Sequence, residues 1–278
     1  NAVMGNRPGT LDEFAHVDVE GYLANDLVSA YLHHRNIKGE VGYDIGALAQ
    51  VGDSIVRFEL FPEEPIIAYK QWHINDENFI DYNLFTQHID ADVSVNNAIS
   101  SVRIYTEHAE HTDHAEGELH QEDIIVKVKD LQLSEWMVID PDSPPMKGDV
   151  SADLRINWGN GRLNGSGSVA LEDFFFGQER VGSFVADLGV STDKTGKIIA
   201  DATLNVDGVK TMTLSGALND ENDESPFKLD MTMIHFPLTV VNPLLPPDVA
   251  SLTGTINGQL KVSGNQDSPT FNGEMSLD

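Results

Sequence analysis

Apolar and polar residues alternate along most of the second half of the chain. A period of two is typical of strands that have one apolar face and one polar face. Segments rich in Asp, Asn, Gly and Thr separate the runs, namely "TDKTGK", "NVDGVK" and "NDENDES", and their composition is that of turns. Four runs predict half-buried antiparallel strands: Phe184, Ala186, Leu188 and Val190; Ala200, Ala202, Leu204 and Val206; Met212, Leu214, Gly216 and Leu218; and Phe227, Leu229, Met231 and Met233.

The first half of the chain shows the same alternation less regularly. Its predicted strands contain Val41, Tyr43 and Ile45; Val56, Phe58 and Leu60; Val93 and Val95; Val102 and Ile104; and Ile124, Val126 and Val128. One segment departs from the pattern, because Leu23, Leu27, Ala30 and Tyr31 fall at helical spacing. This spacing predicts a helix within residues 22–34. Helix is otherwise nearly absent.

Two distant segments of the chain are alike. Residues 148–171 align with residues 254–277 without a gap, and a double proline precedes each segment. Strand modules that recur in this way are typical of proteins that stack repeats in one direction. We therefore expect residues 1–278 to be one continuous piece of a longer repetitive β protein, with 148–171 and 254–277 as repeat units.

The one-sided strands leave an apolar sheet face that must be covered. Since almost no helix is predicted, three all-β architectures remain. These are a β-sandwich, a closed barrel, and an elongated antiparallel sheet folded along its length around an apolar groove. The natural content of such a groove is hydrocarbon, because removing an acyl chain from water is worth roughly 0.8 kcal/mol per methylene group. The alternation by itself does not choose between the sandwich and the groove.

Charge and composition narrow the function. The chain carries 17 basic and 45 acidic residues, a formal net charge of −28, which argues against nucleic acid as a partner because Lys and Arg are scarce. There is no cysteine, so disulfides, thiolate nucleophiles and Cys-ligated zinc are excluded. From Asn1 onward there is neither a signal peptide nor an apolar run long enough to span a membrane. If the parent protein is exported or anchored, we expect another segment to be responsible.

A histidine-rich segment is the strongest candidate for site chemistry. "EHAEHTDHAEGELH" contains His108, His111, His114 and His120, and neutral imidazoles are ligands for zinc and copper. His108, His111 and His114 are a weak metal candidate, because their spacing does not keep them on one strand face. A polar hairpin tip whose charge responds to pH is the favoured interpretation.

Other motifs of catalysis or cofactor binding are lacking. The acidic segments 140–145 and 219–225 do not have the spacing of an EF-hand loop. The glycine-rich segment 159–167 lies between predicted strands and does not open a helix, which argues against a phosphate-binding loop. We therefore expect a protein that is not an enzyme and has no cofactor.

The end of the chain resembles a known family. Residues 236–277 resemble the recurring segment of the TamB/AsmA-like envelope proteins, in which a proline-rich lead precedes alternating glycine and apolar residues. Residues 60–83 resemble the stretch of proline, tryptophan and "N-x-N-x-I" found in that family, here with Asp76, Asn78 and Ile80. The style is similar to versions from Bacteroidetes-type bacteria. The landmarks of the recurring segment are Leu252, Gly254, Ile256, Gly258, Leu260, Val262, Gly264, Pro269, Gly273, Met275 and Leu277.

The resemblance implies a taco-like half tube with an apolar interior. It implies a periplasmic location, a parent anchored in the inner membrane of a Gram-negative bacterium, and an outer-membrane partner of the insertase-barrel type that binds parts of the parent outside this piece. The implied role is phospholipid transport and outer-membrane biogenesis, with phospholipid acyl chains as ligands. An alternative is a scaffold that assembles outer-membrane barrels by strand pairing. The residues expected to line the groove are Val150, Leu154, Ile156, Phe184, Leu188, Leu204, Leu214, Leu229, Met231, Ile256, Leu260 and Val262.

Overall fold

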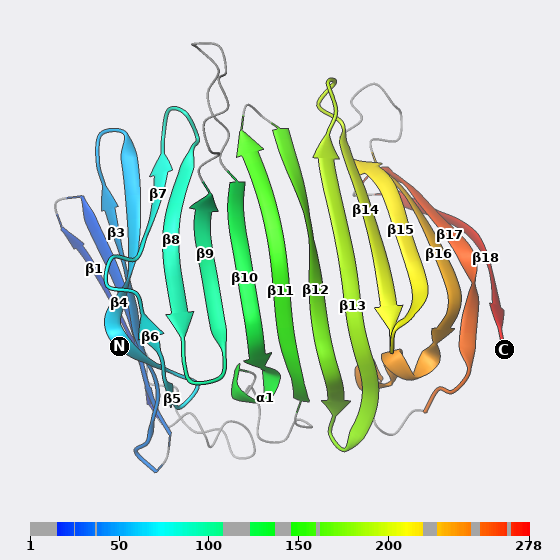
Figure 1. Ribbon diagram of the computed structural model, residues 1–278, viewed down its shortest axis with the longest axis horizontal. Helices are drawn as coiled ribbons and strands as arrows, with labels where there is room; N and C mark the ends of the chain where they lie inside the picture. Colours follow the sequence, from blue (N-terminus) through cyan, green and yellow to red (C-terminus); the bar gives the residue numbers. More distant parts are fainter. Residues whose placement is uncertain are drawn as a thin grey trace. The chain divides into compact units, whose positions relative to one another are not determined.

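The computed structural model describes residues 16–24, 26–36, 38–107, 123–136, 146–159, 162–218, 227–245, 251–265 and 268–278. The chain divides into two compact units, Asn1–Ser151 and Ala152–Asp278. The strands of both units are labelled along the chain in Figure 1. The units are described separately below.

The first unit is an antiparallel sheet. The strands β1, β2, β3 and β4 pair in that order, β4 also pairs with β7, and β7, β8, β9 and β10 continue the order. The short strands β5 and β6 pair with β4 and β8. A four-residue helix, α1 (Leu133–Trp136), follows β10. The strands are β1 (His16–Ala24), β2 (Leu27–Arg35), β3 (Val41–Val51), β4 (Ile55–Ile67), β5 (Lys70–Gln71), β6 (His73–Ile74), β7 (Phe79–Asn83), β8 (Ile89–Asn96), β9 (Ser101–Glu107) and β10 (Asp123–Gln132).

The register gives this sheet one apolar face. Val93 of β8 lies opposite Ile104 of β9, which lies opposite Val126 of β10. On the other face, Arg57 makes a two-pronged ion pair with Asp81 at 2.7 and 2.6 Å. The alternation seen in the sequence is therefore a real separation of the two faces.

The first unit contains a small buried core. Trp72 is 2% exposed and packs with Ile67 and Ala68. Its indole N–H donates to the carbonyl of Ile67 at 3.2 Å, so the polar atom of this buried ring is satisfied. Partly buried neighbours complete the cluster, namely Tyr43, Ile45, Val95 and Leu131.

The helix predicted within residues 22–34 is wrong, because these residues lie in the hairpin of β1 and β2. Ala24 of β1 pairs with Leu27 of β2, and Asp26 between them has a positive φ of 66°. Asp is one of the few residues that adopt this backbone region readily, and it favours tight turns. Since β2 pairs with β3 on its other edge, the two ladders of hydrogen bonds outweigh the local helical spacing.

The second unit is also an antiparallel sheet in which strands pair with their neighbours in sequence from β12 to β18. The strand before it, β11 (Met146–Gly159), begins in the first unit. A short 3₁₀ helix, η1 (Leu238–Leu244), stands between β16 and β17. The strands are β12 (Arg162–Phe176), β13 (Glu179–Thr192), β14 (Ile198–Val206), β15 (Val209–Leu218), β16 (Phe227–Pro237), β17 (Thr255–Asn265) and β18 (Ser268–Leu277).

The turn residues fix this register. Asp207 and Gly208 connect β14 to β15, and both have positive φ, at 48° and 77°. Two consecutive left-handed residues make the turn whose twist matches a two-residue hairpin, and Asp-Gly is a preferred pair for it. Val206 and Val209 consequently pair directly across the turn.

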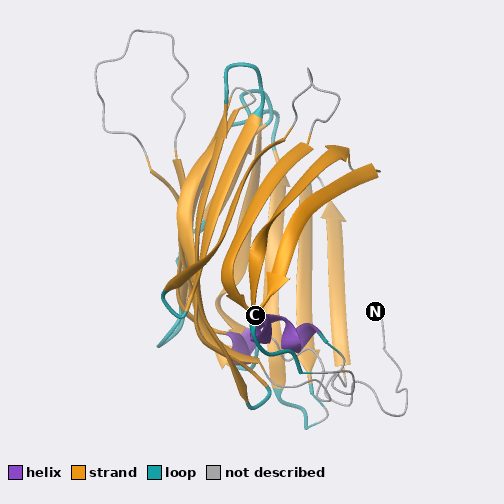
Figure 2. Ribbon diagram, turned by 90° about the vertical axis from the view of Figure 1, so that its right-hand side faces the viewer, coloured by secondary structure: helices purple, strands orange, loops and turns teal. Residues whose placement is uncertain are grey.

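The sheet of the second unit curves. In Figure 1 its strands turn from nearly face-on at β12 to nearly edge-on at β18. The helix η1 follows β16 in sequence yet contacts β13, three strands away, and in Figure 1 it lies at the lower ends of these strands. Figure 2 shows curved strands from the side, with the helices in purple. The curved sheet therefore has a concave side, and η1 occupies one end of it.

The expected all-β, antiparallel fold class is confirmed. Each unit forms one open sheet that is not closed into a barrel, and within the described residues of each unit no second sheet packs face to face as the sandwich alternative requires. The expected repeat segments lie in β11–β12 and in β17–β18; their status as repeats, and the single continuous fragment, stay predictions. Among the described residues, no helix is long and apolar enough to cross a membrane.

Candidate functional site

The main candidate site is the apolar face of the second unit, which is continuous across the sheet. Leu188 of β13 pairs with Ala202, Ala202 with Leu214, Leu214 with Met231, and Met231 with Leu260. Residues that pair directly across antiparallel strands point to the same face. One row of apolar side chains therefore crosses five consecutive strands from β13 to β17.

Further apolar rows lie beside this one. At one flank Phe184 pairs with Val206, and at the other Phe236 pairs with Ile256 and Ile256 with Leu277. The apolar residues that share this face are Leu154, Ile156, Val169, Leu171, Phe184, Ala186, Leu188, Val190, Ile198, Ala200, Ala202, Leu204, Val206, Met212, Leu214, Leu218, Phe227, Leu229, Met231, Met233, Phe236, Ile256, Leu260, Val262, Phe271, Met275 and Leu277. We refer to this set as the apolar face.

The apolar face is not packed as a protein core. Of its residues only Val206 is buried, at 5% exposure, and the others are half-buried or exposed. Leu188 is 42% exposed and Met275 is 54% exposed. Contiguous apolar surface that stays partly exposed is typical of binding sites in soluble proteins.

The residues expected to line the groove gather on this face, with one exception. The register pairs Phe184, Leu188 and Leu204 with other residues of the apolar face, and does the same for Leu214, Leu229, Met231, Ile256, Leu260 and Val262. Leu154 joins them because a Cβ at Gly167 would lie 2.7 Å from its side chain, and Ile156 joins them because a Cβ at Gly165 would lie 3.8 Å from its Cα. Val150 lies in the part of β11 that belongs to the first unit. Whether these side chains contact lipid stays a prediction.

Small residues let neighbouring side chains lie flat against this face. A Cβ at Gly216 would collide with the backbone carbonyl of Lys228 and with the Leu229 side chain. Leu229 thus covers the backbone of Gly216, and Leu154 covers that of Gly167 in the same way. Glycine is needed here for close approach and not for an unusual φ.

The opposite face of the second unit is polar and charged. Lys261 of β17 pairs with Asp230 of β16 at 3.3 Å. Arg180 donates to Asp207 at 2.8 Å, and the backbone N–H of Ser183 donates to the same carboxylate at 3.0 Å. These contacts, that of Arg180 first, hold the pKa of Asp207 below its ordinary value. Lys261 and Asp230 therefore lie on the face that does not bear the apolar rows, and Asp207 lies in the turn between β14 and β15.

Aromatic side chains lie at the end of the apolar face that is near η1. Phe174 and Phe184 meet edge to face with ring centroids 6.3 Å apart, and Val206 is buried beside Phe184 in the register. Since η1 contacts β13, the strand that carries Phe184, the concave side is narrowed at this end.

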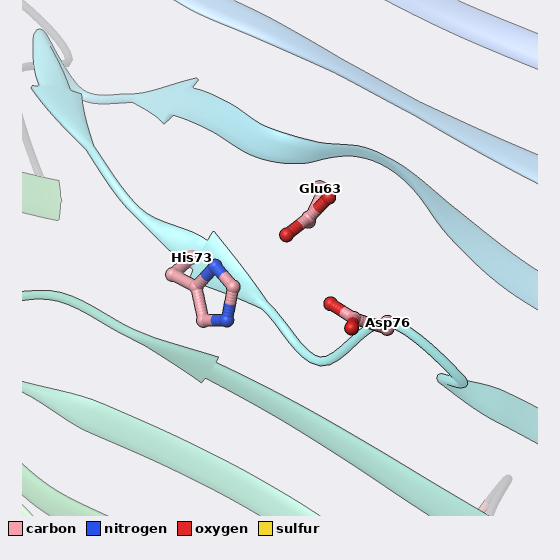
Figure 3. A group of neighbouring side chains, drawn as sticks. All are labelled: Glu63, His73 and Asp76. Carbon is pink, nitrogen blue, oxygen red and sulfur yellow. The ribbon is translucent and has the colours of Figure 1, made fainter.

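The histidine-rich segment gives no site to describe. His108, His111, His114 and His120 lie outside the described residues, as do the acidic segments 140–145 and 219–225. The described residues contain a different group that sequence reasoning missed. Figure 3 shows Glu63, His73 and Asp76 converging on one space.

These three side chains come from separate elements of the first unit. Glu63 lies on β4, His73 on β6, and Asp76 on the turn before β7. Their potential ligand atoms all lie within 4.8 Å of one another, and all three residues are exposed. Isolated charged residues separated by 10 and 3 positions carry no metal-binding spacing, so no signal in the sequence pointed to them.

The chain matched no protein-family model, no curated protein and no solved structure. The likeness to TamB/AsmA-like proteins therefore stays a prediction.

Proposed function

We propose that this protein is a non-enzymatic carrier of phospholipid acyl chains, which lie against the apolar face of the second unit. In this proposal the chain forms part of a lipid-conducting path between the inner and outer membranes of a Gram-negative bacterium and supports outer-membrane biogenesis. The resemblance to TamB/AsmA-like envelope proteins supports the periplasmic setting and an outer-membrane barrel as the partner of the parent.

One observation carries the proposal. The apolar face crosses consecutive strands without interruption, yet its side chains stay half-buried or exposed. Unburied apolar surface is costly at about 25 cal/mol per Å². An occupant of apolar chemistry removes this cost, and hydrocarbon chains match a face that offers no charged side chain in its paired rows.

The energetics favour a ligand that is itself unstable in water. A chain of about sixteen carbons gains on the order of 12 kcal/mol when its methylene groups leave water completely. A curved sheet shelters such a chain on more than one side, whereas a flat sheet shelters one. Partial shelter lowers the barrier to movement through water and still lets the chain slide.

The composition of the face suits sliding contact. Met212, Met231 and Met233 lie together, because Met212 pairs with Met233 and Met231 lies two residues from Met233 on the same strand face. Methionine is flexible and polarizable and adapts to irregular apolar partners. In the rows that contain these methionines, no polar side chain would hold a headgroup at one place.

The test is lipid extraction and native mass spectrometry of the protein purified from bacteria. We expect bound phospholipid in the wild type and its loss in Leu188→Asp, which places a charge on the apolar face at an exposed position. The matched control is Ile199→Asp. Ile199 is 44% exposed and pairs with Ser191 and Ala217 on the opposite face, so this variant should keep its lipid.

The possible outcomes distinguish lipid binding from the strand-pairing alternative. A folded wild-type protein without lipid, or equal lipid in the two Asp variants, would contradict the proposal. The strand-pairing alternative uses backbone groups of a sheet edge, and β18 pairs only with β17 among the strands that the structure describes. That alternative predicts that Met275→Pro on β18, which removes a backbone N–H pointing away from β17, impairs function while Leu188→Asp does not.

A further inference from the structure

We infer that Glu63, His73 and Asp76 form a site for a divalent transition-metal cation of the zinc class. The site belongs to the first unit and does not depend on the proposed lipid function. It is made of other residues than His108, His111 and His114, the histidines that the sequence singled out.

The donor set is the first argument. A group of carboxylates alone would be an ordinary feature of a chain with a net charge of −28. Here an imidazole stands among two carboxylates, with all ligand atoms within 4.8 Å of one another. Imidazole nitrogen suits zinc and its transition-metal neighbours, whereas calcium and magnesium prefer oxygen ligands throughout. Three protein ligands leave further positions for water.

The backbone around the site is the second argument, since it brings the three residues together. Gly46 of β3 pairs with Phe61 of β4, but the next pair is Asp44 with Ile66. Ile45 alone therefore stands opposite residues 62–65, so β4 carries three extra residues that bulge out of the pairing with β3. Bulges re-aim side chains, and Glu63 lies within this one.

Two asparagines hold the turn that carries Asp76. Asn78 brackets Leu60 of β4, because its side-chain oxygen accepts from the Leu60 N–H at 2.7 Å and its amide donates to the Leu60 carbonyl at 3.1 Å. Asn75 makes a similar pair of hydrogen bonds with Ser94 of β8. Its side-chain oxygen accepts from the Ser94 N–H at 2.8 Å, and its backbone N–H donates to the Ser94 carbonyl at 3.1 Å. The turn is thus tied to strands on both sides, so the ligand backbone is fixed before any ion binds.

The surroundings favour a cation. Glu63 and Asp76 line a surface hollow of about 570 Å³, and Glu59 and Glu77 line it as well. Arg57 also lines the hollow, but its guanidinium is engaged by Asp81 at 2.7 and 2.6 Å. The excess of carboxylates in the hollow therefore attracts cations toward Glu63 and Asp76, and His73, which does not line the hollow, approaches these two residues from β6.

The side chains must move slightly to close on an ion. Ligands of one zinc ion lie ~2.1 Å from the metal, and so closer together than 4.8 Å. The exposure of all three residues permits this movement. A bound ion would then connect β4, β6 and the turn before β7, which gives the site a second measurable effect, stabilisation of the folded protein.

The experiment is isothermal titration of zinc into the metal-free wild type and four variants. We expect His73→Ala and Asp76→Asn to weaken one zinc site at least about tenfold, since even the loss of a residue that only orients a ligand has that effect. Glu77→Gln is the matched control, because it removes a carboxylate of the same hollow next to Asp76 without removing a ligand. The fourth variant replaces His108, His111 and His114 by Ala together and should keep the site.

Thermal unfolding gives an independent readout. Zinc should raise the unfolding midpoint of the wild type and of Glu77→Gln, and should leave that of His73→Ala unchanged. The inference is overturned if the wild type binds no zinc at micromolar concentration, if His73→Ala binds zinc as the wild type does, or if the triple histidine variant loses all binding.

Discussion

Shortening Leu188 tests whether the apolar face is the lipid-binding surface. Leu188 is 42% exposed, and complete burial of a leucine side chain is worth about 1.5–3 kcal/mol. An acyl chain that covers the remaining surface gains about 1 kcal/mol from this side chain. Leu188→Ala loses most of that gain, so the dissociation constant for lipid should rise about fivefold.

Ile199→Ala provides a control of the same size. Ile199 is 44% exposed and lies on the neighbouring strand β14, but it pairs with Ser191 and Ala217 on the polar face. Both variants remove similar apolar surface, and their effects on folding should be similar. Only Leu188→Ala should change lipid affinity.

The assay is fluorescence anisotropy of a phospholipid that carries a fluorescent acyl chain, titrated with each variant. Urea unfolding of the same samples verifies that both variants are folded. The reasoning is refuted if the two variants weaken binding equally, because lipid would then not distinguish the faces. It is also refuted if Leu188→Ala binds as tightly as the wild type.

Three further predictions concern stability. Trp72→Ala should lower the free energy of unfolding by about 3–5 kcal/mol, because it empties the buried core of the first unit and removes an indole hydrogen bond. Gly216→Ala should cost about 1–3 kcal/mol, because the added methyl group collides with the neighbouring strand and with Leu229. Asp207→Asn should reduce the loss of unfolding free energy that the wild type shows as the pH falls into the acid range. The ion pair with Arg180 lowers the pKa of Asp207 in the folded state below its ordinary 3.8, so its contribution is present above that pH and is lost as the pH falls toward the folded value.

Urea titrations measure all three effects, the last one repeated from pH 5 down to pH 2.5. A change below 1 kcal/mol in Trp72→Ala would contradict the assigned core. A neutral Gly216→Ala would show that β15 and β16 do not approach as closely as the register requires. A constant difference between Asp207→Asn and the wild type over the whole pH range would rule out the ion pair as its cause.

Pairing between strands decided the secondary structure of residues 22–34, where the local sequence pattern was ambiguous. Leu23, Leu27, Ala30 and Tyr31 satisfy helical spacing, but Leu27 and Tyr31 also belong to a strand of nine residues. That strand, β2, is paired on both of its edges, with β1 on one and with β3 on the other. Short apolar segments satisfy both periods, and only the presence of partner strands decides between them.

The candidate metal group is a feature that the sequence did not predict at all. Glu63, His73 and Asp76 come together because a bulge in β4 and two asparagine clamps bring separate segments to one place. Each of these is a contact between residues distant in sequence. A single sequence contains no local trace of them, so the group was not predicted.

The sequence by itself determined which side chains share a face. Alternation with a period of two follows from the geometry of a strand, so the apolar rows of β13 to β16 were predictable before their partners were known. Only the tertiary structure decided the register that joins these rows into one face, the curvature around η1, and the exposure of that face. Register and curvature depend on hydrogen bonds, bulges and packing between strands, and these interactions exist only once the strands have been brought together.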